Sequence, residues 1–275
     1  MGSWDAWIGR TQEQTDVLTP GLLQRFRATI DSDMTGDIAP QGIHWCLCLP
    51  DAVTAELGDD GHPKRGGFMP PISLPRRMWA ASDITFHAPL HSGADVVRRS
   101  TITEIVEKQG SSGPSVFVTI EHKTSADGAL AVSERQSLVY REAATSVAPT
   151  AHSDDTADLS NWPIHRHIIP SEPLLFRYSA LTFNSHRIHY DQPYATGTEG
   201  YRGLVVHGPL MATLLLDLAA REFGANMLKR FSMRARSPAF VGEPLHLVTK
   251  TDGACVSLMA LGDDRRTVMT AEAEI

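Results

Sequence analysis

The sequence predicts an α+β fold of two similar halves, in each of which an antiparallel sheet curls around a long helix. Three observations support this: the order of elements repeats weakly within the chain, strand-like segments close each half, and residues 210–223 form a helix that is apolar nearly all round. A helix of that kind has to be covered by other structure, so strands are expected to wrap it.

The repeat is visible in short matched segments. Phe26-Arg-Ala-Thr-Ile parallels Phe176-Arg-Tyr-Ser-Ala, and the segment that starts at Gly42 parallels the one that starts at Gly203. Each of the latter two is expected to lead into a helix.

Residues 143–160 are small, polar and aperiodic, as is typical of a surface linker. We therefore expect an N-terminal unit over 1–142, a linker over 143–160 and a C-terminal unit over 161–275.

Helix ends can be placed from capping residues. Thr19-Pro20 is typical of a helix start, and that helix should run to about Ile30. Asp51 can cap a short helix over 52–57. Gly208-Pro209 opens the longest helix and Gly224 ends it. The segment that begins at Tyr178 is interpreted as a strand that breaks into a polar, histidine-bearing loop.

The remaining segments favour strands and loops. Residues 57–68 are rich in glycine and charge and are expected to form a mobile loop. The expected strands, rich in β-branched or alternating residues, are 96–106, 115–123, 129–141, 245–251, 254–261 and 267–275.

Composition excludes several classes of function. The 275 residues carry a net charge of −7 without a Lys/Arg run, so nucleic acid is not an expected partner. No window holds the roughly 18 apolar residues of a membrane span, and no signal-peptide pattern opens the chain. The three cysteines lack the spacing of a disulfide framework or a metal site. We expect a cytoplasmic protein without a bound metal.

Candidate catalytic residues gather around the polar loop and the helix start. His189 is a candidate general acid–base, Asn184 can hold a water, and the N–H of Gly208 at a helix N-terminus can stabilise an oxyanion. Each also has a simpler interpretation: a capping histidine, a turn asparagine and a plain helix cap.

Further residues are candidates for substrate binding. His207 precedes the helix, Asp191 follows His189 by two residues, and Arg187 precedes His189 by two residues. Arginine pairs suit phosphate groups, so the candidates for a phosphate-bearing carrier are Arg76, Arg77, Arg234 and Arg236. Solvated strand-end charges and packing are the alternatives. Nucleotide-binding, nucleophile-elbow and zinc-protease motifs do not occur in the sequence.

These residues resemble a known family. Tyr178 to Asp191, Val205-Val-His-Gly-Pro209 and Arg76-Arg-Met-Trp-Ala80 are similar to the MaoC-like hydratase/dehydratase family in its double hotdog form. The branch is that of type-2 hydroxyacyl-thioester dehydratases and mesaconyl-C4-CoA or itaconyl-CoA hydratases. The family uses an Asp and a His five residues apart, and here Asn184 occupies the Asp position. The first half lacks this motif, so the resemblance implies a non-catalytic N-terminal unit and a motif-bearing C-terminal unit.

The resemblance implies a hydro-lyase that hydrates an α,β-unsaturated acyl-CoA, with CoA as part of the substrate and no other cofactor. Mesaconyl- or itaconyl-CoA is one expected substrate class and an (R)-3-hydroxyacyl thioester of fatty-acid type is another. A carrier-protein thioester in place of CoA, and a homodimer, are compatible with it. The rivals are a hotdog thioesterase, for which Asp217 would be the helix carboxylate, and a non-catalytic thioester-binding protein.

Overall fold

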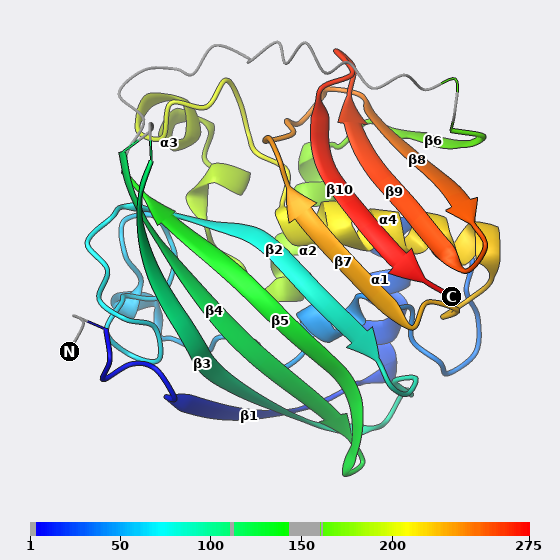
Figure 1. The fold of residues 1–275 in the computed structure, drawn as a ribbon, viewed down its shortest axis with the longest axis horizontal. Helices are drawn as coiled ribbons and strands as arrows, with labels where there is room; N and C mark the ends of the chain where they lie inside the picture. Colours follow the sequence, from blue (N-terminus) through cyan, green and yellow to red (C-terminus); the bar gives the residue numbers. More distant parts are fainter. Residues whose placement is uncertain (1–3, 111–112, 143–159, 161) are drawn as a thin grey trace.

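The computed structural model describes residues 4–110, 113–142, 160 and 162–275. Within them, one antiparallel sheet of ten strands runs in the order β1-β3-β4-β5-β2-β7-β10-β9-β8-β6, with α1, α2 and α4 on one of its faces (Figure 1). The strands are β1 (Thr11–Val17), β2 (Arg76–Phe86), β3 (Asp95–Gly110), β4 (Gly113–Ala126), β5 (Ala129–Arg141), β6 (Ile164–Ile168), β7 (Arg230–Ala235), β8 (Leu245–Asp252), β9 (Cys255–Gly262) and β10 (Thr267–Glu274). The helices are α1 (Pro20–Ile30), α2 (Glu172–Thr182), α3 (Gln192–Gly197) and α4 (Gly208–Phe223), and 3-10 turns include η1 (Ile43–Cys46), η2 (Thr54–Glu56) and η4 (Arg187–His189).

The two halves repeat one topology. In the first, β1 and α1 precede four strands paired in the order β3-β4-β5-β2, and in the second, β6 and α2 precede strands paired in the order β8-β9-β10-β7. The expected duplication of element order is therefore present. The expected linker lies almost wholly outside the described residues.

One strand pair joins the halves into a single sheet. β2 and β7 run antiparallel from Ala81↔Arg234 to Thr85↔Arg230. Because β2 also pairs with β5 and β7 with β10, the inner face of the sheet continues from one half into the other.

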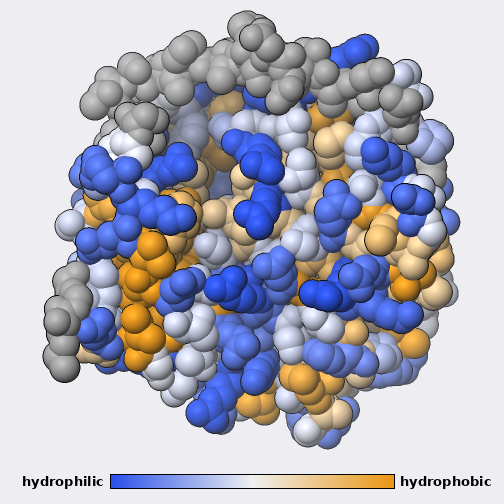
Figure 2. Space-filling view, viewed as in Figure 1, coloured by the Kyte–Doolittle hydropathy of each residue, from blue (hydrophilic) through white to orange (hydrophobic). Residues whose placement is uncertain are grey.

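Helix α4 fills the space under the second half. All ten residues from Leu210 to Ala219 are buried, as the nearly all-apolar sequence predicted. The opposite face of the sheet is open to solvent, and hydrophilic side chains spread across its middle (Figure 2). In the described part of the chain, no helix is long and apolar enough to cross a membrane.

Three expectations about helices are wrong. The segment at Tyr178 lies in helix α2, which begins after Ser171: the Ser171 hydroxyl accepts a hydrogen bond from the Leu174 N–H, and a proline stands in the first turn. The first half has no counterpart of α4, since only η1 and η2 lie between α1 and β2. Residues 52–57 likewise form the single 3-10 turn η2 rather than a helix capped by Asp51.

A buried carboxylate ties α4 to its surroundings. Asp217 is 5% exposed and accepts hydrogen bonds from Arg166 on β6 and from Arg221 one turn further along α4. Arg221 also bonds Asp33 and the carbonyl of Asp31, just after α1. These contacts connect α4, β6 and the end of α1.

We expect Asp217→Ala to lower the free energy of unfolding by about 3 kcal/mol, because it leaves arginine charges unpaired beside a buried helix. Urea unfolding followed by circular dichroism measures the change. Glu222→Ala, an exposed carboxylate on the same helix, is the control and should stay within about 0.5 kcal/mol of wild type. Equal stability of the two variants would contradict the structural role of Asp217.

Candidate active site

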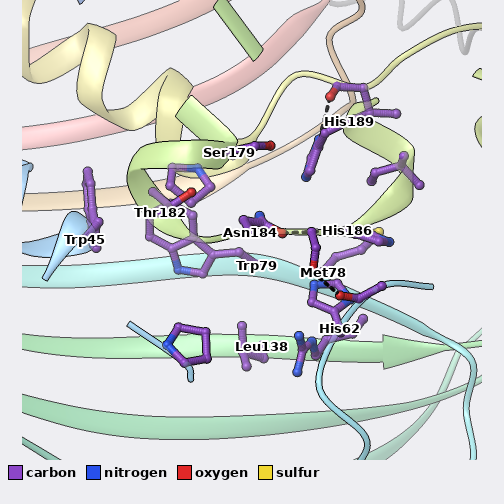
Figure 3. Close-up of a pocket in the computed structure, with 18 of the residues that line it drawn as sticks. Trp45, His62, Met78, Trp79, Leu138, Ser179, Thr182, Asn184, His186 and His189 are labelled. Carbon is purple, nitrogen blue, oxygen red and sulfur yellow. Dashed lines mark hydrogen bonds between the residues drawn. The ribbon is translucent and has the colours of Figure 1, made fainter. Parts of the chain in front are cut away.

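A cleft of about 2330 Å³ extends across the inner side of both halves. It is lined by the loop that precedes β2, by β2 to β5, by α2 and the turns after it, and by the start of α4. In Figure 3, His62, His186 and His189 lie along one side of this pocket and Trp45 and Trp79 lie toward the other. Both halves therefore contribute side chains to one site.

His189 is held as a base that faces the cleft. It is 7% exposed, sits at the end of η4 and donates from Nδ1 to the carbonyl of Val205 at 2.7 Å. Because a carbonyl can only accept, the proton is on Nδ1 and the Nε2 lone pair is free. Burial lowers the pKa of His189 to about 4, so the imidazole is neutral near pH 7.

The same contact places His189 beside the start of α4. Val205 also donates its N–H to the carbonyl of Ile188 at 2.9 Å, so the chain before α4 pairs with η4 three residues ahead of Gly208. Gly208 is the first residue of α4, where helix N–H groups lack partners in the helix. His189 and Gly208 both line the cleft.

Gly208 also allows close packing. A Cβ at this position would lie 3.3 Å from Cε3 of Trp79 on β2. Trp79 in turn donates to Ser82, whose hydroxyl donates to the buried Glu134 of β5, and Trp45 donates to the same carboxylate. The first half thus fixes the two indoles that face the helix start.

Asn184 follows the end of α2. Its Oδ1 accepts from the backbone N–H of His186 at 2.9 Å, so the carbonyl end of the amide is engaged in the turn, and Nδ2 is the group that it can offer to a ligand. Asn184 lines the cleft together with His189. The fold therefore brings the three expected catalytic residues, His189, Asn184 and Gly208, into one region.

His207 supports His189 from behind. It is fully buried, stacks on the His189 ring with centroids 3.6 Å apart, and shares a hydrogen bond between Nε2 and the Ser179 hydroxyl at 2.8 Å. It is not among the residues that line the cleft, and burial holds its pKa well below the usual range. Of the two interpretations, packing and substrate contact, the structure places His207 in a packing position.

The loop before β2 brings in two residues that the sequence reasoning missed. The segment at Asp60 to His62 packs on the turn at Ser185, and the His62 ring lies 4.1 Å from that of His186, which in turn lies 5.4 Å from that of His189. Residues 57–68 were expected to be a mobile loop, whereas the structure docks them on the second half. Only the neighbouring Gly-Asp-Asp-Gly-His pattern hinted at this.

Asp60, His62 and His186 are also close enough to share a cation, since their ligand atoms lie within 4.8 Å of one another. In the structure, however, Asp60 Oδ2 accepts from Nδ1 of His62 at 3.0 Å. The positive charge of Arg77 acts on both imidazoles and contributes to lowering their pKa values. That charge disfavours a dication here.

The expected binding residues separate into two groups. Arg76, Arg77 and Arg236 line the cleft, and Arg76 pairs with Glu199 at 3.0 Å. Arg187, Asp191 and Arg234 are not among the lining residues. Arg187 donates twice to Asp191 and its guanidinium lies over the ring of Tyr194, so this pair joins the turn after α2 to α3.

Comparisons with solved structures identify the fold. A MaoC-like dehydratase superposes with a TM-score of 0.74 at 13% identity, covering 99% of both chains. A conserved Mycobacterium tuberculosis protein described as a double hotdog fold superposes with a TM-score of 0.60 at 13% identity, covering 97% of this chain and 95% of its own. The fold is therefore the expected double hotdog.

The sequence comparisons identify the family. The model of hydroxyacyl-thioester dehydratase type 2 matches residues 42–241. Mesaconyl-C(4)-CoA hydratase of Chloroflexus aurantiacus is 42% identical over 99% of this chain and 98% of its own length, and mitochondrial hydroxyacyl-thioester dehydratase type 2 of Schizosaccharomyces pombe is 27% identical over 82% and 81%. The chain belongs to the hydroxyacyl-thioester dehydratase type 2 family, which confirms the resemblance drawn from the sequence.

The lowered pKa of His189 predicts an unusual pH dependence. With a pKa of about 4 instead of 6.5, the base form persists in acid, so kcat/KM for hydration of a thioester should stay level from pH 8 down to about pH 5. Unfolded imidazoles bind protons below pH 6.5 and the buried one does not, so stability falls as the pH drops through this window. Circular dichroism at each pH keeps the two effects apart. An inflection near pH 6.5 in folded enzyme would contradict the assignment.

Proposed function

We propose that the protein adds water reversibly across the double bond of an α,β-unsaturated dicarboxylyl-CoA thioester of the mesaconyl-C4 kind. The proposal rests on one observation: His189, with a free imidazole Nε2, and Gly208, with its helix-start N–H, line the same cleft. The 42% identical relative over nearly the whole chain supports the substrate class.

The chemistry follows from charge. The Gly208 N–H, at the positive end of α4, donates a hydrogen bond to the thioester oxygen and stabilises the negative charge that develops there. His189 Nε2 takes a proton from a water held by Nδ2 of Asn184, as the water oxygen bonds to the β-carbon and the π electrons move toward the thioester oxygen. The imidazolium then gives that proton to the α-carbon, which completes hydration with His189 neutral again.

The lining of the first half supports a short polar acyl group over a fatty one. Without a counterpart of α4, the sheet of this half opens directly onto the cleft. Its polar lining residues are Gln12, Gln14, Arg98, Ser100, His122, Glu134 and Gln136. An alkyl chain there would remove polar and charged side chains from water, which costs free energy.

Arg77 supports a negative charge on the acyl group. Among the arginines that line the cleft in the described ranges, it alone is partly buried with a guanidinium that makes no hydrogen bond or ion pair to another described residue. In mesaconyl-C4-CoA the β-carbon carries a carboxylate, so the charge would lie close to the reacting atoms. Arg76 and Arg236 are proposed to bind the CoA phosphates.

A hotdog thioesterase would need a helix carboxylate that faces the cleft, and Asp217 does not supply it. Asp217, the acidic residue well inside α4, pairs with Arg166 and Arg221 and does not line the cleft. We retain a cytoplasmic location, a homodimer, and the division of the chain into a supporting first unit and a motif-bearing second unit as proposals.

The function is tested with mesaconyl-C4-CoA, itaconyl-CoA, crotonyl-CoA and a longer enoyl-CoA, by loss of the conjugated double bond and by thiol release. Hydration without thiol release is expected. His189→Ala should lower kcat by about 10²- to 10⁴-fold, the range for a general acid–base. Hydration by this variant at the wild-type rate, or thiol release by the wild type, would contradict the proposal.

Arg77→Met should lower kcat/KM for mesaconyl-C4-CoA by about 10- to 100-fold, as expected for loss of a charge-assisted hydrogen bond. The same variant should lose much less with crotonyl-CoA, which has no carboxylate. Arg99→Met, an exposed arginine outside the cleft, is the matched control. Equal losses with both substrates would show that Arg77 does not recognise the carboxylate.

A further inference from the structure

The loop before β2 presents an oriented imidazole to the cleft. Asp60 Oδ2 accepts from Nδ1 of His62 at 3.0 Å, and its Oδ1 accepts from the His62 backbone N–H at 2.9 Å. A carboxylate acceptor keeps the proton on Nδ1, so the Nε2 lone pair is the free end of the ring. His62 lines the cleft.

Contacts between the halves hold this loop in place. The Ser185 hydroxyl donates to the carbonyl of Gly61 at 2.6 Å, and Arg187 donates its backbone N–H to the carbonyl of Asp60 at 2.9 Å and its side chain to the carbonyl of Asp59 at 3.0 Å. Gly61 has a φ of +85°, and a Cβ there would lie 1.9 Å from the Ser185 carbonyl oxygen. This glycine therefore permits a backbone contact that no other residue allows.

The position of Asn184 leaves a need that His62 can meet. An asparagine can accept a hydrogen bond from a water only through its Oδ1. The carbonyl end of Asn184 is already used by the His186 N–H. The Asp60–His62 pair lies on the same side of the cleft, one imidazole away from His189.

We propose that His62 is a second catalytic residue of the hydration, supplied by the first half and oriented by Asp60. This inference rests on the proposed function. The attacking water has two hydrogens: His189 takes one as a proton, and His62 Nε2 accepts a hydrogen bond from the other. The O–H bond whose proton goes to His189 breaks as the water oxygen bonds to the β-carbon. The proton then passes from His189 to the α-carbon. His62 stays neutral and keeps the oxygen lone pair directed at the β-carbon.

In this scheme Asp60 is a positioning residue. It does not contact the substrate, and it acts by fixing the tautomer and the direction of the His62 ring. The nearby charge of Arg77 and burial lower the pKa of His62 to about 4, which keeps Nε2 an acceptor at neutral pH.

The test compares His62→Gln and His62→Gly with wild type, using mesaconyl-C4-CoA for turnover and succinyl-CoA, a saturated thioester, for binding. We expect kcat to fall about 10²-fold with the Kd of succinyl-CoA unchanged, and added imidazole to restore part of the activity of His62→Gly. Asp60→Ala should lower kcat while leaving KM unchanged. Melting temperatures show whether the variants are folded.

The control is another histidine of the same kind. His91 pairs through Nδ1 with Asp37 Oδ2 at 3.3 Å on the surface, outside the cleft. His91→Gln should turn over at the wild-type rate.

Four results would overturn the inference. Folded His62→Gln with wild-type kcat removes His62 from the chemistry while the hydratase proposal stands. Weakened succinyl-CoA binding that accounts for the whole loss assigns His62 to binding. Loss of wild-type activity on dialysis against a chelator, restored by zinc, makes Asp60, His62 and His186 a metal site. A wild type that hydrates no thioester overturns the proposed function and this inference with it.

Discussion

The site depends on the antiparallel pairing of β2 with β7. This pairing is the only ladder between the halves among the described strands, and it sets the inner faces of two curled sheets side by side. Trp79 on β2 thereby reaches the first residue of α4, although the two are far apart in sequence. A slip of one residue would turn Trp79 to the outer face of the sheet and remove the wall opposite the helix start.

Around that joint the two halves have diverged in content while keeping one topology. The second retains the buried helix and offers its N-terminus, whereas the first replaces the helix with two short turns and gives the space to the cleft. The first half instead holds a buried carboxylate: Glu134 accepts hydrogen bonds from Trp45 and Ser82. Burial raises its pKa, but the neighbouring imidazoles of His44 and His122 and the Ser82 hydroxyl outweigh burial and lower the pKa to about 2.

Much of this could be predicted from the sequence. Strands β3, β4, β5, β8, β9 and β10, helix α1 with its Thr19 cap and helix α4 follow from local patterns, whereas β1, β2, β6 and β7 were not predicted. The motif predicted that His189, Asn184 and Gly208 would meet in one cleft. Helix α2 was missed because aromatic and polar residues around Tyr178 suggested a strand, although Ser171 and Pro173 repeat the start of α1 and the internal duplication pointed the same way. Capping chemistry was the better guide at this position.

The contribution of Asp60 and His62 could not be predicted, because it depends on contacts between Gly61 and Ser185, which are 124 residues apart. A glycine- and charge-rich stretch has the composition of a loop whether or not a partner surface receives it. The docking of Gly61 on Ser185 also has a consequence for the whole chain. Because groups from both halves face one cleft, the site is complete only when both halves are folded and in contact.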